Sequence, residues 1–136
     1  MKIIFLVLLL SPFLMLSQNK LSVEVTGVKS NAGSVLVAVY NSSDSFLDSD
    51  KMFSGGSSKA QMGSTRVIIE NLPDGEYALA IFHDEDGNDE LNTNWIGIPK
   101  EPICFSIGKM KTFGPPKYEE CAFKLEGDRE IQVTFK

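Results

Sequence analysis

Apolar and polar residues alternate along several short segments after residue 17, and this alternation predicts β-strands. Leu21, Val23 and Val25 are separated by polar residues, which is the period of a strand with one buried face. Two other segments are apolar on both faces, as is typical of central strands that are covered on both sides. The expected strands cover residues 21–26, 34–40, 67–69, 76–83, 121–125 and 130–135.

Residues that favour turns separate the expected strands. Turn signals occur at 31–33, 71–75 and 127–128, where Asn, Asp, Gly and Pro gather. Residues 53–63 are rich in Ser and Gly and are expected to form a loop. About seven short strands with turns between them, and no long helical period, predict an all-β fold, a single antiparallel β-sandwich.

Two segments fit this scheme less simply. Residues 42–52 are expected to contain one helical turn, with Phe46, Leu47 and Met52 facing inward. Residues 84–120 carry little strand pattern, and structureless loops longer than about 15 residues are uncommon in compact domains. This long irregular stretch is therefore expected to be organised by another interaction or to be functional.

The N-terminal residues have the pattern of a secretory signal peptide. Lys2 is followed by an unbroken apolar run over residues 3–10, and Ser17 is a small residue before a polar segment. We therefore expect residues 1–17 to be removed. Residues 18–136 would then form the mature domain, periplasmic or secreted and without a membrane span. The apolar run also leaves open an uncleaved N-terminal anchor.

Composition and charge limit the classes of function. The 136 residues suffice for one domain, and 13 Lys and Arg against 18 Asp and Glu give a formal net charge of −5. Nucleic-acid-binding domains carry a basic surface, so we expect no nucleic-acid partner. The sequence has no Gly-rich phosphate-binding loop, CxxC pair or cluster of histidines, which excludes nucleotide enzymes and most zinc sites.

The chain has two cysteines, Cys104 and Cys121. Export to an oxidising compartment would allow them to form a disulfide, which would tie the irregular stretch to a strand. Two buried free thiols are the alternative. Nothing else in the sequence suits either cysteine to catalysis.

Five carboxylates fall within residues 84–90, directly after an expected central strand, and no Lys or Arg lies among them. Like charges this close repel one another, so the loop is either fully solvated or neutralised by a bound cation. The spacing of oxygen ligands resembles that of EF-hand and dockerin loops and predicts calcium. The expected ligands are Asp84, Asp86, Asn88 and Asn92 through their side chains, and Glu90 through its backbone carbonyl.

Two positions depart from the calcium-loop pattern. Asp89 stands where Gly usually makes the sharp turn, and Trp95 stands where a bidentate acid usually binds. Asp tolerates a left-handed backbone better than most residues, whereas the missing acid has to be replaced by Asn94 or a carbonyl. A solvated turn, and magnesium or manganese in place of calcium, stay open as alternatives.

His83, the only histidine in the chain, lies beside this loop. Adjacent residues of a strand point to opposite faces, so His83 and Asp84 would not form a catalytic pair directly. No Ser or Cys occupies a nucleophile-elbow pattern. We expect His83 to orient the loop through a hydrogen bond rather than to exchange protons with a substrate.

Longer motifs add a family resemblance. The turn at 71–77, NLPDGEY, resembles the Leu-Pro-x-Gly-x-Tyr turn of transthyretin-like and carboxypeptidase-regulatory-like β-sandwiches. Further motifs are YALAIFHDEDGN at 77–88, LNTN at 91–94, GIPKEP at 97–102, FS at 105–106, FGPP at 113–116 and AF at 122–123. With these motifs, residues 21–135 resemble the secreted bacterial family catalogued as domain of unknown function 2141.

The resemblance implies an exported protein of a Gram-negative bacterium with a single β-sandwich domain, and it implies no known reaction. This sequence departs from the family pattern where Asp89 replaces the usual Gly of the acidic loop. It also departs where Cys104 and Cys121 occupy positions that small residues often fill.

These observations predict an exported, non-catalytic β-sandwich module that binds calcium and an unidentified extracytoplasmic protein, peptide or glycan. One alternative is a small exported hydrolase that uses His83 and the acidic loop. Another is carbohydrate or peptide binding by the irregular stretch, since aromatic rings are common at binding surfaces. Its aromatic residues, which could instead close the core over the sandwich end, are Trp95, Phe105, Phe113 and Tyr118.

Overall fold

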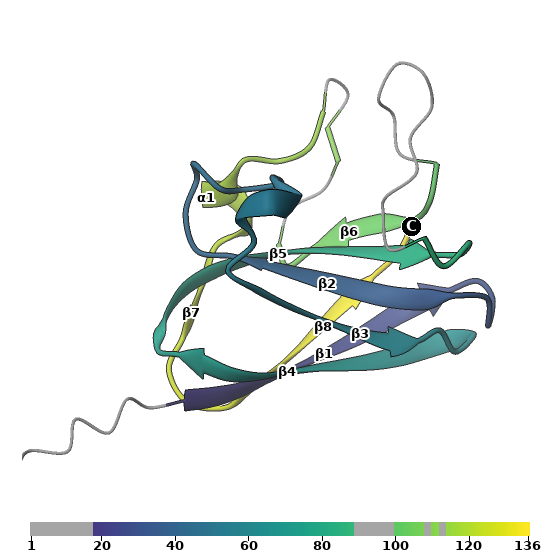
Figure 1. The fold of residues 1–136 in the computed structure, drawn as a ribbon, viewed down its shortest axis with the longest axis horizontal. Helices are drawn as coiled ribbons and strands as arrows, with labels where there is room; N and C mark the ends of the chain where they lie inside the picture. The colour runs from purple at the N-terminus through teal and green to yellow at the C-terminus, as the bar shows by residue number, and fades with distance from the viewer. Residues whose placement is uncertain (1–17, 89–99, 108–109, 112–113) are drawn as a thin grey trace, which may run out of the picture.

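The alternating segments form strands that pack as two sheets around a shared core (Figure 1). The structure is a computed structural model and describes residues 18–88, 100–107, 110–111 and 114–136. The described elements are β1 (Gln18–Val28), β2 (Ser34–Tyr40), a 3-10 helix (Ser49–Lys51), β3 (Ser54–Lys59), β4 (Gly63–Pro73), β5 (Gly75–Asp84), β6 (Ile103–Phe105), α1 (Tyr118–Cys121), β7 (Phe123–Leu125) and β8 (Arg129–Thr134).

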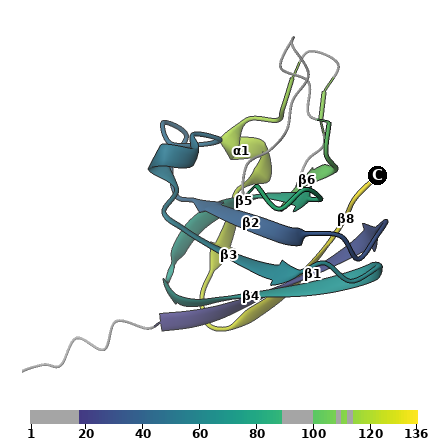
Figure 2. The ribbon, with the colours of Figure 1, turned by 45° about the vertical axis from the view of Figure 1, so that its right-hand side comes forward.

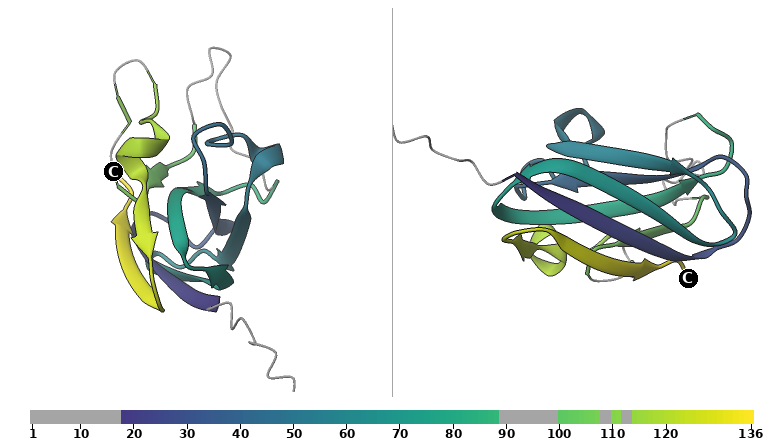
Figure 3. Two further views of the ribbon diagram at one scale, coloured as in Figure 1. Left: turned by 90° about the vertical axis from the view of Figure 1, so that its left-hand side faces the viewer. Right: turned by 90° about the horizontal axis from the view of Figure 1, so that it is seen from below.

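One sheet has the strand order β4-β1-β8, and the other has the order β3-β2-β5-β6, with β7 also pairing with β5. Figure 2 shows the second sheet lying over the first, and the right-hand view of Figure 3 shows β1 between β4 and β8. The predicted all-β sandwich is confirmed. Its pairing is antiparallel except between β1 and β8, which run parallel because the chain crosses from one sheet to the other after β7.

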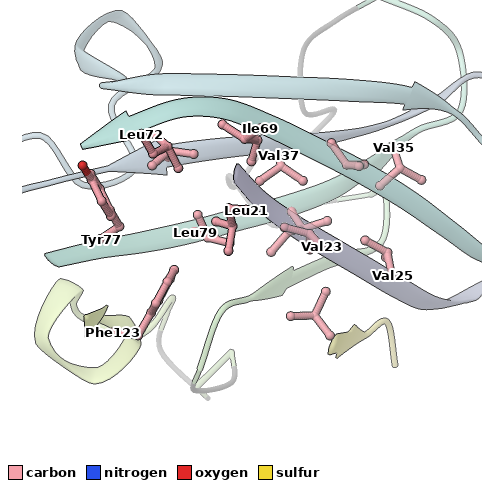
Figure 4. Close-up of a cluster of buried hydrophobic side chains, with 14 of the residues drawn as sticks. Leu21, Val23, Val25, Val35, Val37, Ile69, Leu72, Tyr77, Leu79 and Phe123 are labelled. Carbon is pink, nitrogen blue, oxygen red and sulfur yellow. The ribbon is translucent and has the colours of Figure 1, made fainter. Parts of the chain in front are cut away.

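The core between the sheets is made of the apolar residues of the alternating strands (Figure 4). Leu21, Val23 and Val25 of β1 are fully buried, as their spacing predicts. Each such side chain stabilises the fold by about 1.5–3 kcal/mol relative to exposure. The other strands of both sheets add Val35, Val37, Val39, Val67, Ile69, Leu79, Ile81 and Val133 to this core.

The outer face of the second sheet carries a second buried cluster, which explains why β2 and β5 are apolar on both faces. It contains Tyr40, Phe105 and Tyr118, and Phe46 packs edge-on against Tyr40. Phe46 therefore faces inward as expected. Leu47 and Met52 do not, because they are 36% and 45% exposed on the segment that crosses this face.

Strand β3 corrects the expectation of a loop at 53–63. Its Ser and Gly residues pair with β2 from Ser54 to Lys59. A Cβ atom on Gly56 would lie 3.2 Å from the Ile69 side chain and 3.3 Å from the backbone oxygen of Ile68, both in β4. Small residues are needed here because β3 lies against β4 where the edges of the two sheets meet.

The irregular stretch at 84–120 also contains regular structure where the structure describes it. Ile103–Phe105 form β6, which pairs with β5, and α1 begins at Tyr118. The Ser106 hydroxyl donates to the Cys121 carbonyl at 2.7 Å and accepts from the Leu79 backbone N–H at 3.0 Å. These bonds fasten the stretch to the sheet.

Within the described ranges, no helix has the length and apolar character needed to cross a membrane.

The expected Cys104–Cys121 disulfide is not formed, and both residues are free cysteines. Cys104 pairs with Ile81 and packs against the core between the sheets. Cys121 lies in the second cluster, on the other face of the same sheet. The sheet therefore separates the two thiols. Burial raises the pKa of Cys104 to about 12, and burial together with Glu120 raises that of Cys121 to about 11.

Both thiols are therefore expected to react slowly in the folded protein. Raised pKa values reduce the thiolate fraction at mildly alkaline pH, so alkylation should be roughly a hundredfold slower than in the unfolded chain. Without any reductant, denaturation should allow two alkyl groups to add, as measured by intact mass. An unreduced, denatured protein that accepts none would instead establish the disulfide.

Candidate metal centre

Three carboxylates meet at the end of β5. One oxygen from each of Asp84, Asp86 and Glu101 lies within 4.8 Å of those of the other two. Asp84 is fully buried and Glu101 is 8% exposed, whereas Asp86 faces solvent. The group lies where the end of β5 meets the turn before β2 and the segment before β6, on the right in Figure 1.

Asp84 is positioned by strand pairing and by close packing of the neighbouring turn. It is the last residue of β5 and pairs with Ser34 at the start of β2. Gly33 has a positive φ of 66°, and a Cβ atom there would lie 1.8 Å from the Asp84 backbone oxygen. Glycine is therefore required for the turn to approach the backbone of Asp84 so closely.

Glu101 is brought to the group by the antiparallel register between β5 and β6. Phe82 pairs with Ile103, and the His83 backbone N–H donates to the Pro102 carbonyl at 3.0 Å. The same register places Glu101 opposite Asp84. The Glu85 backbone N–H then donates to Glu101 Oε2 at 2.6 Å, which fixes the carboxylate.

The expected ligands are thus brought together in part. Asp84 and Asp86 meet as predicted, and the Asn88 backbone N–H donates to Asp86 Oδ1 at 3.2 Å. Glu90 and Asn92 lie outside the described residues. Glu101 is absent from the predicted ligands because it lies outside the continuous loop whose spacing predicts them. The signal for it is the pairing of residues 103–105 with β5, whose register brings Glu101 next to Asp84.

The geometry of the three carboxylates suits a hard cation. Calcium binds oxygen at 2.3–2.6 Å, so ligands on opposite sides of one ion lie up to about 5 Å apart. Two unit charges 4.8 Å apart repel by about 3 kcal/mol at an effective dielectric constant of 20. A cation at the centre of the group would replace this repulsion with attraction.

His83 makes a hydrogen bond, but to the turn before β2 and not to the acidic loop that it was expected to orient. The fully buried ring places Nε2 2.6 Å from the Ala32 carbonyl, so Nε2–H is the donor. The ring stacks on Phe135, and Nδ1 lies 3.8 Å from a Glu85 carboxylate oxygen. His83 therefore holds the turn before β2 against β5 and does not bond to the expected ligands through this nitrogen.

Aromatic residues of the irregular stretch contribute to the core where they are described. Phe105 and Tyr118 are buried in the second cluster, and the Tyr118 hydroxyl donates to the Glu76 carbonyl at 3.3 Å. Burial, with smaller effects from nearby acidic groups, raises the pKa of Tyr118 to about 12. These two residues close the core, and Trp95 and Phe113 lie outside the described residues.

Gly33→Ala is expected to destabilise the protein by more than about 2 kcal/mol, because the new methyl group would overlap the Asp84 backbone. Gly63→Ala is the matched control. Gly63 also has a positive φ, of 91°, but no atom lies within 4 Å of the added carbon. Its expected cost is about 1 kcal/mol, from the left-handed backbone alone. Urea unfolding measures both, and equal losses would contradict the close approach of the turn.

Comparison with known proteins places the chain in a family. A family described as an uncharacterized protein conserved in bacteria, DUF2141, matches residues 23–133. No curated protein and no solved structure matches the chain. The match covers both sheets, from β1 to β8, together with the carboxylate group at the end of β5. The chain therefore belongs to the bacterial family of domain of unknown function 2141.

Proposed function

We propose that this protein is an exported, non-catalytic β-sandwich module that binds calcium through Asp84, Asp86 and Glu101. The observation that carries the proposal is the meeting of three carboxylate oxygens within 4.8 Å, with two of the three residues buried. Gathering negative charge inside a protein is unfavourable unless a cation, a proton or hydrogen-bond donors compensate it. Oxygen ligands of this kind are those that calcium prefers.

The surroundings of His83 support a structural role for it. A general acid or base needs a nitrogen within reach of the substrate. In His83 the ring is fully buried, Nε2 donates to a backbone carbonyl, and Nδ1 faces Glu85. A hydrolytic reaction through this residue would require that packing to open. We therefore favour a binding module over a hydrolase.

Export is proposed from the N-terminal signal-peptide pattern, with removal of residues 1–17 and a periplasmic or secreted domain of a Gram-negative bacterium. Calcium is more abundant outside the cytoplasm, so sites of moderate affinity are useful there. We propose an extracytoplasmic protein, peptide or glycan as the partner of the module. The acidic net charge of −5 does not favour nucleic acid.

Calcium is expected to raise the melting temperature of the purified protein. At a concentration a hundredfold above Kd, binding to the folded state adds about 2.7 kcal/mol to its stability. Glu101→Gln should abolish this response while leaving the calcium-free protein equally or more stable, because it removes one of three repelling charges. Thermal unfolding and calorimetric titration measure both quantities.

The control for this experiment is Glu70→Gln, which removes the same charge from an exposed position on β4. It should leave the calcium response unchanged. No heat and no thermal shift in the unmodified protein would refute calcium binding. An equal response to magnesium would indicate charge screening in place of a calcium site.

His83→Ala is expected to destabilise the protein by about 2–4 kcal/mol, since it leaves a cavity and removes the bond to Ala32. His83→Gln keeps an N–H donor of similar reach and should retain most of this stability. The unmodified protein should show no turnover of esterase, phosphatase, glycosidase or peptidase substrates. Turnover that disappears in a stably folded His83→Gln variant would establish an enzyme instead.

A further inference from the structure

The chain contains two Asp–Gly pairs, Asp74-Gly75 and Asp86-Gly87. In such a pair the Gly amide nitrogen can attack the side-chain carboxyl carbon of Asp. A five-membered imide closes, and one water molecule is released. Water then reopens the imide. Cleavage at the side-chain carbonyl restores Asp, and cleavage at the backbone carbonyl leaves isoaspartate, with no net change in mass.

The structure holds the first pair in place. Gly75 belongs to β5 and pairs with Leu125 of β7. The Asp74 carboxylate accepts a hydrogen bond from the Asn19 side-chain amide at 2.7 Å. Ring closure at Asp74 would have to break this bond and move a backbone nitrogen that belongs to a paired strand.

The second pair lies beyond the end of β5, outside any strand. Asp86 is exposed, and Gly87 has a φ of 72° with no atom within 4 Å of the position that a Cβ would take. Segments outside paired strands open at a lower cost in free energy than strands do. Ring closure here would have to release the hydrogen bond that the Asn88 backbone N–H donates to Asp86 Oδ1 at 3.2 Å, but it would move no residue of a paired strand.

We propose that Asp86 is a site of spontaneous isoaspartate formation, whereas Asp74, with the same Asp–Gly sequence, is protected by the fold. The modified residue has one more carbon in its backbone, and its free carboxylate sits on the α-carbon. It would no longer meet Asp84 and Glu101. If the proposed calcium site holds, the modification destroys it, and bound calcium slows the reaction by retaining the Asp86 carboxylate.

The full chain, incubated in EDTA at physiological temperature and near-neutral pH, tests the proposal. A protease that cleaves before Asp but not before isoaspartate, followed by mass spectrometry of the peptides, locates the product. Isoaspartate should accumulate at residue 86 at least about tenfold faster than at residue 74, given the difference in local opening. In the urea-unfolded chain both positions should react at similar rates. Equal rates in the folded protein, or product at residue 74 alone, would overturn the proposal.

Two further arms complete the test. Asp86→Glu keeps the carboxylate but would need a six-membered ring, so product at this position should disappear while the slow reaction at Asp74 is unchanged. Adding calcium to the unmodified protein should slow the reaction at residue 86 alone. If calcium has no effect while the difference between the two pairs persists, the modification site stands and the proposed calcium site fails.

Discussion

The antiparallel pairing along β5 holds the second sheet together and also gathers the carboxylates of the candidate metal centre. On one edge, β5 pairs with β2 from Ala78 to Asp84, and on the other it pairs with β6 and β7. Segments that are distant in the chain are thereby fixed relative to one strand. A register shift of one residue would turn Ile81 away from the core and separate Glu101 from Asp84. Core packing and site geometry therefore depend on the same register.

Much of the fold could be predicted from the sequence because β1, β2 and β5 bury one or both faces, and burial leaves a period in the side chains. β3 leaves no such signal. Its residues are small because the strand lies against β4. The contact of Gly56 with β4 joins segments that are not adjacent in the sequence, so no local pattern indicates it. The parallel pairing of β1 with β8 leaves no signal in the sequence either, since it depends on where the chain crosses between the sheets.

The candidate metal centre could be predicted only in part, for related reasons. Asp84 and Asp86 are close in the chain, so a loop pattern was enough to pair them. Glu101 arrives through β6, and three residues are too few to show a period. The carbonyl bonded to His83 belongs to Ala32, in a turn remote in sequence. Local patterns identified which residue types matter, and strand pairing decided which of them meet.

The parallel pairing of β1 with β8 has a mechanical consequence. The start of β1 and the end of β8 lie at opposite ends of the paired segment that runs from Leu21 with Arg129 to Thr26 with Thr134 (Figure 1). A force that pulls Gln18 and Thr134 apart would load every bond of this ladder in shear at once, because the bonds lie across the direction of pull. The hydrogen bonds between β1 and β8 would bear the force together and would not break one after another. A domain held at both ends in this way resists stretching more than its modest size suggests.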